Sequence, residues 1–297
     1  MTIHGAISAI VTPFTADAAA VDERALRDLV DRTVAAGADG IIACGGTGEF
    51  TALSTEERHE VVRIVTEQTA GRIPVIAQTG GLSTREAIAH ADHAASAGAD
   101  ALMVAPPFYE PLSTAQAEEY FGDVATATEL PIMLYNYPRG TGLAMDAELI
   151  VSLAGQHGNI RFVKDSSADA FLLSRLVSEY GDRVGTFCGE DVLVGAALTI
   201  GALGLVTGSF NFMMPVHATM LQAARAGDHA TVSRLWRETL PLVVCLASNP
   251  YTSAVKTACS ILGHDVGPVR APLPAISARG REELQARIAA LDPAYFG

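Results

Sequence analysis

Eight short apolar runs, each followed by a segment of helix length, recur along the first two thirds of the chain. Parallel strands that are buried on both faces read as continuous apolar stretches of this kind, and alternation with helices is typical of α/β folds. Eight such units predict a closed (β/α)8 barrel, a TIM barrel. The runs begin at Ala6, Gly40, Pro74, Ala101, Pro131, Ile160, Gly185 and Leu203.

Repeated turn signals support this prediction. "AAGADGIIA" from Ala35 and "SAGADALMV" from Ser96 both end a helix in Gly and enter the next strand through Ala-Asp. Three helices are expected to begin with an S-x-x-E/Q capping box, at Ser54, Ser83 and Ser113. The loops between strand ends and helix starts therefore lie on one rim of the barrel.

We expect residues 1–214 to supply the barrel strands and loops. Residues 215–297 then supply the last barrel helix and a C-terminal helical extension packed on the barrel, as one domain overall, because no Pro/Gly/Ser-rich linker divides them. A doubly wound sheet is the alternative. The absence of a G-x-G-x-x-G turn after the first strand counts against its dinucleotide-binding version.

Charge and cysteine usage exclude several classes of partner. Lys and Arg number 20 and Asp and Glu 33, so the net charge is −13 and the pI about 5.0. Such a chain repels nucleic acids and anionic membranes as a whole, although one basic pocket can still bind a small anion. No apolar stretch reaches the roughly 18 residues of a membrane span. A reducing cytoplasm is expected, because there is no secretory segment and no CxxC pair among Cys44, Cys188, Cys245 and Cys259.

In a barrel of this type the chemistry lies at the C-terminal ends of the strands. Lys164 ends the sixth run and Tyr135 the fifth. A strand-end Lys usually extends to solvent and a strand-end Tyr usually packs in the core, but here both fall on the same rim. An amine held among apolar neighbours has a lowered pKa and can attack a carbonyl to form a Schiff base, and a phenol beside it can carry the protons.

Two loops on the same rim are candidates for substrate contacts. Gly45-Gly46-Thr47-Gly48 can present backbone N–H groups and a hydroxyl to a carboxylate, although Gly-rich turns after strands are common. Tyr109 lies in the loop after the fourth run.

The remaining reactive residues are poor candidates. His90 and His93 lie in mid-helix, away from the strand ends, so we expect no metal there, and His59 is expected to be solvated. Cys44 and Cys188 are expected to pack as small apolar groups.

Six motifs spread over nearly the whole chain resemble the dihydrodipicolinate synthase and N-acetylneuraminate lyase family. The resemblance implies a (β/α)8 barrel, Schiff-base chemistry on pyruvate-type substrates without metal or organic cofactor, and a homotetramer built as a pair of dimers. The motifs are "AIVTPF" at Ala9–Phe14, "GGTGE" at Gly45–Glu49, "PPFY" at Pro106–Tyr109, "LYNYP" at Leu134–Pro138, "VKDSS" at Val163–Ser167 and "NPYTSAVK" at Asn249–Lys256.

The resemblance also assigns roles. Lys164 is implied as the imine-forming lysine, Tyr135 as the proton-transferring tyrosine, and Tyr109 as the tyrosine inserted into a neighbouring subunit's site. The resemblance implies Thr47 and its neighbouring amides as the carboxylate site. We expect the substrate-binding residues to be Gly46, Thr47, Gly48, Arg139 and Val206.

Two departures separate the chain from the synthase proper. The synthase loop reads G-T-T-G-E, and its first Thr links two tyrosines in a proton relay, whereas this chain has Gly46. The synthase places an Arg directly before the T-G that follows "YN-x-P", whereas Gly140 stands here and Arg139 precedes it. "GGTGEF" and "FNFMMP" are similar to sugar-acid dehydratases of the family, and "VKDSS" to its 2-keto-3-deoxy acid aldolases and dehydratases.

The sequence therefore predicts a lyase that forms a Schiff base with a 2-keto acid, of the 2-keto-3-deoxy sugar-acid type, and cleaves, condenses or dehydrates it. Dihydrodipicolinate synthase activity is the first alternative. A non-catalytic barrel that binds a keto acid as a sensor is the second, but a pure binder needs neither Lys164 nor Tyr135.

Overall fold

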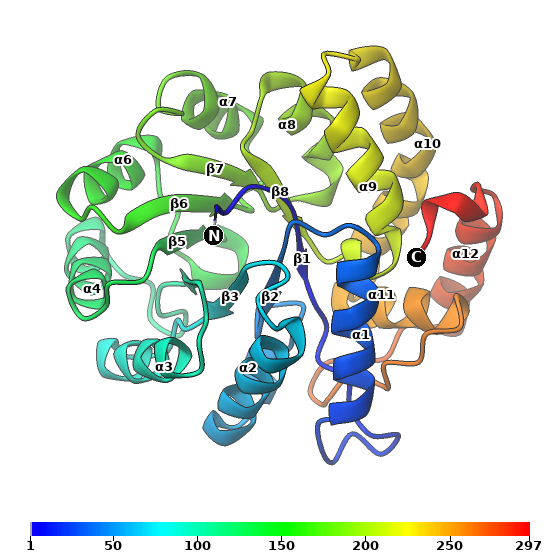
Figure 1. Cartoon of the computed structure of the whole chain (residues 1–297), viewed down its shortest axis with the longest axis horizontal. Coiled ribbons are helices and arrows are strands. Elements are labelled where there is room, and N and C mark those ends of the chain that lie inside the picture. The colour runs from blue at the N-terminus through cyan, green and yellow to red at the C-terminus, as the bar shows by residue number, and fades with distance from the viewer. Residues whose placement is uncertain (1) are drawn as a thin grey trace.

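Eight parallel strands close into one barrel in the computed structural model, which describes residues 2–297 (Figure 1). β1 pairs with β2 on one side and with β8 on the other, so the sheet has no free edge. The predicted (β/α)8 barrel is confirmed. The strands are β1 Gly5–Ala9, β2 Gly40–Ala43, β3 Val75–Gln78, β4 Ala101–Val104, β5 Ile132–Asn136, β6 Ile160–Asp165, β7 Gly185–Cys188 and β8 Gly204–Thr207.

The helices form a ring outside the barrel, and the last of them gather at one side of it (Figure 1). The α-helices are α1 Glu23–Ala35, α2 Thr55–Thr69, α3 Thr84–Ser96, α4 Thr114–Thr126, α5 Pro138–Thr141, α6 Ala147–Gln156, α7 Ala170–Ser178, α8 Val194–Ile200, α9 Phe210–Arg225, α10 His229–Ala247, α11 Tyr251–Ile261 and α12 Ala278–Ala289. Three short 3-10 helices are η1 Phe50–Ala52, η2 Asp191–Leu193 and η3 Pro293–Tyr295.

Helix starts follow the capping chemistry of the sequence. Ser54 and Ser113 form complete capping boxes with Glu57 and Gln116. Ser83 accepts from the backbone N–H of Glu86, but the Glu86 carboxylate accepts from Leu82 instead of closing the box. Each helix therefore begins just beyond a loop on the rim where the strands end, which positions those loops around one opening.

The two faces of each strand belong to two separate cores. One core lies between strands and helices, and the other fills the barrel interior. The alternation of side chains along a strand places Met133 and Tyr135 of β5 in the interior core, with Phe162 of β6 packed against it. Lys164, two residues beyond Phe162, therefore points inward too, and the β5–β6 register sets it directly beside Tyr135.

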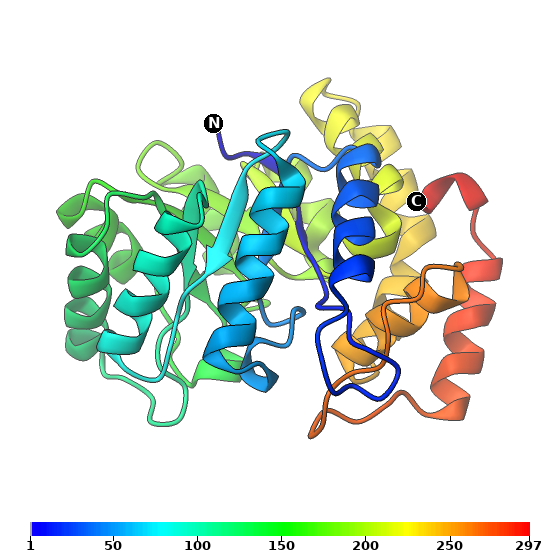
Figure 2. The ribbon, with the colours of Figure 1, turned by 60° about the horizontal axis from the view of Figure 1, so that its bottom comes forward.

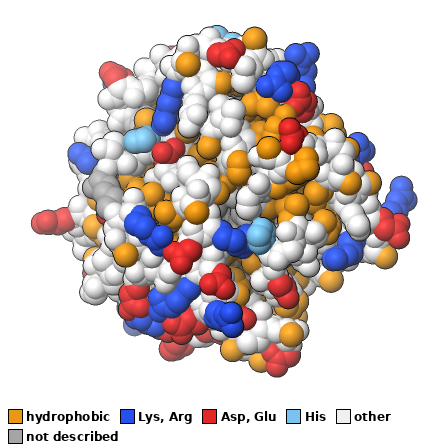
Figure 3. All heavy atoms as spheres, turned by 45° about the vertical axis from the view of Figure 1, so that its right-hand side comes forward, with side chains coloured by type: hydrophobic (Ala, Val, Ile, Leu, Met, Phe, Trp, Pro, Cys, Tyr) orange, Lys and Arg blue, Asp and Glu red, His pale blue; other side chains and the backbone are white. Residues whose placement is uncertain are grey.

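The C-terminal extension covers one side of the barrel (Figure 2). α9 is interrupted at Met213 (φ −117°, ψ 19°), so a single turn from Phe210 precedes the longer helix that starts near Pro215. α10 packs on α8 and α9, and α12 packs on α10 and α11. The surface on this side mixes apolar, acidic and basic side chains (Figure 3). None of the helices between residues 2 and 297 has both the length and the apolar character needed to span a bilayer.

α2 and α3 meet at a cluster of histidines. His59, expected to be solvated, is half-buried and stacks on His93 with ring centroids 3.8 Å apart; that expectation was wrong, because α3 packs against the face of α2 that carries it. Arg58 Nη1 lies 2.9 Å from His90 Nε2, and since a guanidinium can only donate, His90 Nε2 is the acceptor. Among residues 2–297 no group of three His, Cys, Asp or Glu side chains is arranged to hold a metal ion.

This cluster predicts a loss of stability in acid. Burial, then the charges of Arg58 and His59, lower the pKa of His90 from 6.5 to about 4, against the opposing effect of Glu86; burial also lowers the pKa values of His59 and His93. A lowered folded-state pKa means that the unfolded chain binds the proton first, so stability is full above pH 6.5 and falls as the pH drops toward 4. We expect His90 to account for up to about 3 kcal/mol of that loss.

Urea unfolding at pH 7 and pH 5 tests this. His90→Gln should be less stable than wild type at pH 7, because it loses the Arg58 contact, but its stability should change less between the two pH values. His229→Gln, an exposed histidine at the start of α10, is the control. An equal drop in wild type and His90→Gln would contradict the assignment.

Candidate active site

Lys164 is one of only two lysines in the chain, and both are buried. Its Nζ lies 4.3 Å from the centroid of the Tyr135 ring, at the C-terminal end of β6. A Cβ built on Gly189 would lie 2.7 Å from Lys164 Cε, so the absence of a side chain at residue 189 leaves room for the lysine. Burial lowers the pKa of Lys164 to about 8, against the charges of Asp191 and then Glu190, which raise it. A large fraction of the amine is therefore neutral near pH 8 and can act as a nucleophile.

Tyr135 lies directly beside Lys164 and is itself buried. Burial raises the pKa of Tyr135 to about 12, and the neighbouring Ser166 hydroxyl opposes the shift. The phenol is thus protonated at neutral pH and available as a proton donor. Tyr137 stacks on it with ring centroids 5.7 Å apart, which fixes its orientation.

The residues that follow Lys164 hold this strand end in place. Asp165 points to the outer face of the barrel, where its carboxylate accepts from the Asn136 side chain at 2.8 Å and from the Ser167 hydroxyl at 3.0 Å. Ser166 donates to the carbonyl of Gly189 at 3.0 Å. The "KDSS" motif therefore ties β6 to β5 and β7 on either side of the lysine.

Two carboxylates follow β7, and the charges of both act on Lys164. Glu190 pairs with Arg139, Nη2 to Oε2 2.9 Å, at the rim. Burial raises the pKa of Glu190, and the Arg139 charge opposes the shift. Asp191 is buried and accepts a hydrogen bond from the hydroxyl of Tyr251 at 2.6 Å. The amine thus lies over a phenol ring and within the influence of two acidic groups.

The loop after β2 faces the same opening. No described group accepts a hydrogen bond from the backbone N–H of Gly46, Thr47 or Gly48, while the Thr12 hydroxyl donates to the Gly48 carbonyl at 2.7 Å. A Cβ built on Gly46 would have Tyr135 Oη, at 4.0 Å, as its only neighbour within that distance. The loop therefore offers free N–H donors, and the space beside the phenol is open.

A buried ion pair anchors this loop from behind. Glu49, at φ 57°, places its carboxylate Oε1 2.6 Å from Lys256 Nζ of α11, and its Oε2 accepts from the backbone N–H of Arg270 at 2.8 Å. Lys256 also donates to the Pro268 carbonyl at 2.8 Å. The second lysine is thus committed to a structural contact.

The other predicted site residues are placed differently. Arg139 reaches the rim, but its guanidinium is bound to Glu190 and its side chain is 64% exposed. Val206 is buried in the barrel interior core together with Tyr135. Tyr109 is 85% exposed and lies outside the site of its own chain.

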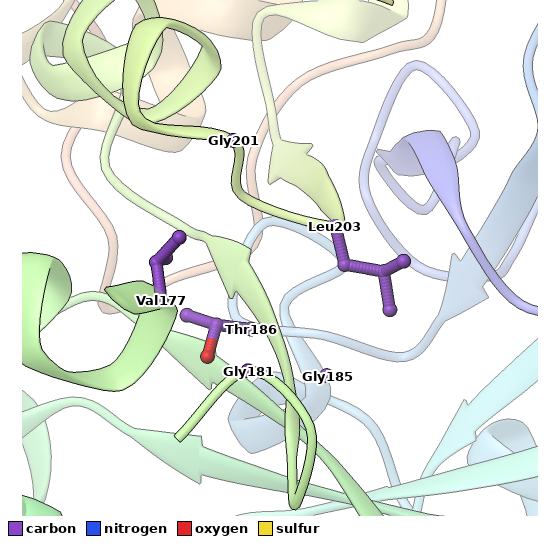
Figure 4. A pocket seen from close by; sticks show the side chains of 6 residues that line it. All are labelled: Val177, Gly181, Gly185, Thr186, Gly201 and Leu203. Atoms are coloured by element: carbon purple, nitrogen blue, oxygen red, sulfur yellow. The ribbon is translucent and has the colours of Figure 1, made fainter. Parts of the chain in front are cut away.

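A pocket of about 140 Å³ lies at the other end of the barrel (Figure 4). It is lined by Val177, Gly181, Gly185, Thr186, Gly201 and Leu203. Gly185 begins β7 and Leu203 precedes β8, whereas Lys164 lies near the opposite ends of the strands. With no charged or nucleophilic lining group other than the Thr186 hydroxyl, this pocket has no part in the chemistry.

Comparison with known proteins decides the family. The model of the dihydrodipicolinate synthetase family matches residues 2–291. The chain belongs to this family. It is a class I lyase of the dihydrodipicolinate synthetase type, and the expected resemblance is confirmed.

Three relatives illustrate its range. The chain is 35% identical over 271 residues to a 4-hydroxy-tetrahydrodipicolinate synthase of Methanopyrus kandleri, covering 91% of this chain and 90% of that protein. It is 35% identical over 290 residues to an uncharacterized DapA-like lyase of Halobacterium salinarum, covering 97% and 94%. The crystal structure of YagE, a prophage protein of the dihydrodipicolinic acid synthase family from E. coli K12 in complex with pyruvate, superposes with a TM-score of 0.92 at 31% identity, covering 97% and 98%.

Some residues of this family member were missed by the sequence reasoning. Glu190 and Asp191 directly follow the seventh run, so the rule that located Lys164 and Tyr135 at strand ends would have found them. Tyr251 begins a helix of the extension, far from any strand end, and no local signal points to the barrel mouth.

Proposed function

We propose that this lyase forms a Schiff base between Lys164 and a 2-keto acid, and that the substrate is a 2-keto-3-deoxy sugar acid. One observation carries the proposal: the chain holds a buried amine of lowered pKa in contact with a buried phenol at the C-terminal rim of the barrel. A lysine that served only to fill space would lose hydration without compensation.

The chemistry follows from these groups. The neutral amine of Lys164 adds to the C2 carbonyl, and loss of the C2 oxygen as water leaves a protonated imine. The imine withdraws electrons from C3, so that a C3 proton or the C3–C4 bond can be released to give the enamine. Dehydration then expels the C4 hydroxyl as water; aldol cleavage instead releases C4 as an aldehyde after its hydroxyl loses a proton. Tyr135 supplies and takes up protons at these steps.

The substrate carboxylate would bind at Thr47. The free N–H groups of the Gly46 to Gly48 loop support this, because such donors favour an anion. Val206 belongs to the same interior core as Tyr135 and would define the floor of the site.

The rest of the site favours hydroxyl groups over a second anionic carboxylate. Asp191 is an acceptor for hydroxyls and repels an anion, and Arg139 and Glu190 are already paired with each other. The open space at Gly46 leaves room for substrate atoms beside the Tyr135 hydroxyl. A side chain at residue 140 would meet the Tyr137 ring at 2.3 Å, so an arginine there would displace that ring.

We therefore expect this protein to be a poor dihydrodipicolinate synthase. With pyruvate and aspartate semialdehyde, kcat/KM should be about two orders of magnitude below that of a true synthase, because a charge-assisted contact to the second carboxylate is worth a few kcal/mol and is missing here. A coupled assay measures this, run beside the monocarboxylates 2-keto-3-deoxygluconate and 2-keto-3-deoxyarabonate. The dicarboxylate 5-keto-4-deoxyglucarate, run in the same panel, tests whether a second carboxylate is tolerated.

The names of the relatives make the synthase the competing function. Synthase-level turnover with the semialdehyde and none with the sugar acids would reverse our ranking. If Arg139→Ala then abolished that turnover, Arg139 would be the group that replaces the missing arginine. Product analysis of the same panel separates dehydration from aldol cleavage.

We further propose a homotetramer in the cytoplasm. Tyr109 is highly exposed, as are Phe171 (73%) and Leu82 (54%), which supports burial of these side chains against other subunits, with Tyr109 inserted into a neighbour's site. The four cysteines are buried and unpaired, which supports a reducing compartment. Light scattering of the purified protein gives the assembly, and a monomer would contradict this proposal.

A further inference from the structure

Tyr251 lies in the barrel mouth although it belongs to the C-terminal extension. Its hydroxyl donates to Asp191 Oδ2 at 2.6 Å and accepts from the backbone N–H of Gly208 at 3.1 Å. η2, the end of β8 and α11 are thus joined at one oxygen atom. A Cβ built on Gly208 would lie 2.8 Å from Tyr251 Oη and 2.9 Å from Thr47 Cγ2, so the phenol lies close to the loop that offers the free N–H donors.

The bond restrains a carboxylate that has no other partner. Asp191 Oδ1 is buried and accepts no hydrogen bond from any described group. At 2.6 Å, the Tyr251 bond is at the short end of the range for hydroxyl donors. Of the charges that act on Lys164, that of Asp191 has the largest effect, yet the two residues form no direct ion pair. Without the Tyr251 hydroxyl, the carboxylate would be free to turn toward that ammonium.

We propose that Tyr251 is a positioning residue that holds the Asp191 carboxylate off Lys164 and thereby sets the pH range in which the lysine reacts with a keto acid. The inference rests on the proposed Schiff-base function. It gives the C-terminal extension a role in the chemistry of the barrel, because the hydrogen bond between Asp191 and the extension runs through this hydroxyl.

Asp191 is the charged group near Lys164 whose effect can change with its position, because the other groups around the lysine are neutral or already paired. Lys164 lies over the ring of Tyr135 from β5, and the other groups that act on it are Cys188 of β7 and Glu190, which Arg139 partly neutralises. The charge of Asp191 also acts on His217 of α9. Burial lowers the pKa of His217 to about 4, so it is neutral from pH 6 upward. Burial, then Asp191, raise the pKa of Tyr251, which keeps its proton.

Two substitutions should shift the pKa of Lys164 in opposite directions. Tyr251→Phe keeps the ring but frees the carboxylate to approach the ammonium, which stabilises the charged amine and shifts its titration to higher pH. Asp191→Asn removes the negative charge and shifts the titration to lower pH. Each substitution is expected to shift the titration midpoint of Lys164 by roughly 0.5 to 1 pH unit.

The readout is the rate at which pyruvate is trapped on the protein by cyanoborohydride between pH 6 and 9.5, followed by intact mass. Tyr295→Phe is the matched control, since Tyr295 also donates to a carboxylate, that of Glu238, but on the exposed surface of the extension. Tyr295→Phe should leave unchanged the midpoint of the rise in trapping rate with pH. In the Asp191→Asn background, Tyr251→Phe should add no further shift, because Tyr251 acts through Asp191.

A wild-type midpoint in Tyr251→Phe would overturn the proposal, and so would a further shift in the double variant. Urea unfolding of each variant separates loss of the fold from a change in titration. If Tyr251→Phe does not fold, an unmoved midpoint in Asp191→Asn still overturns the proposal. Failure of the wild type to trap pyruvate at any pH would instead reject the proposed function, so the two failures are distinct.

Discussion

Replacing Lys164 by alanine is expected to lower turnover of any accepted 2-keto acid by about 10⁴-fold or more. The variant loses the only nucleophile at the strand ends that can form an imine. The remaining groups can bind the keto acid, but none of them can replace the imine in withdrawing electrons from C3. The fold should survive, because alanine removes a buried amine whose loss of hydration opposes folding. Steady-state rates with the best substrate of the panel measure the effect.

Lys256 is the matched control for this substitution. Both lysines are buried, but Lys256 is bound to Glu49 and lies behind the loop. Lys256→Gln should weaken stability, because it leaves Glu49 without its partner, while the folded fraction keeps a turnover within a few fold of wild type. Substantial turnover in Lys164→Ala would show that the reaction does not pass through Lys164.

Tyr135→Phe is expected to reduce kcat by about 10²-fold or more with an intact fold. Phenylalanine keeps the packing against Tyr137 and the barrel interior but has no proton to exchange among the carbinolamine, imine and enamine. The imine should still form slowly, so trapping should be delayed rather than abolished.

Tyr137→Phe is the control for loss of a hydroxyl from this stacked pair of rings. Tyr137 is half-buried and its ring stacks on that of Tyr135. A normal rate in Tyr135→Phe would move proton transfer to another group, with Tyr109 of a neighbouring subunit the next candidate.

The fold and the position of the reactive pair could be predicted because both depend on local rules. Apolar runs that alternate with segments of helix length determine the barrel. The two-residue period of a strand points Tyr135 and Lys164 inward at the same level. The start of a helix at Ser54 or Ser113 depends on a few neighbouring atoms. None of this requires knowledge of distant parts of the chain.

Glu190 and Asp191 stand at a strand end, but their contacts could not be predicted in the same way. The Tyr251–Asp191 bond joins residues 60 apart and the Arg139–Glu190 contact residues 51 apart. Both depend on how the C-terminal extension and the loops dock on the finished barrel. His59 shows the same limit, because its burial depends on the packing of α3 against α2 rather than on the charges of its own helix.

The most direct test of the Schiff base is intact-mass spectrometry of the protein incubated with pyruvate, or with a longer 2-keto acid, and borohydride. Because the chain has only two lysines, peptide mapping can assign the adduct without ambiguity. The account predicts one reduced adduct per chain on Lys164, none on Lys256, and none in Lys164→Ala. An adduct that persists in Lys164→Ala, or a wild-type protein that gains no mass with any keto acid, would contradict it.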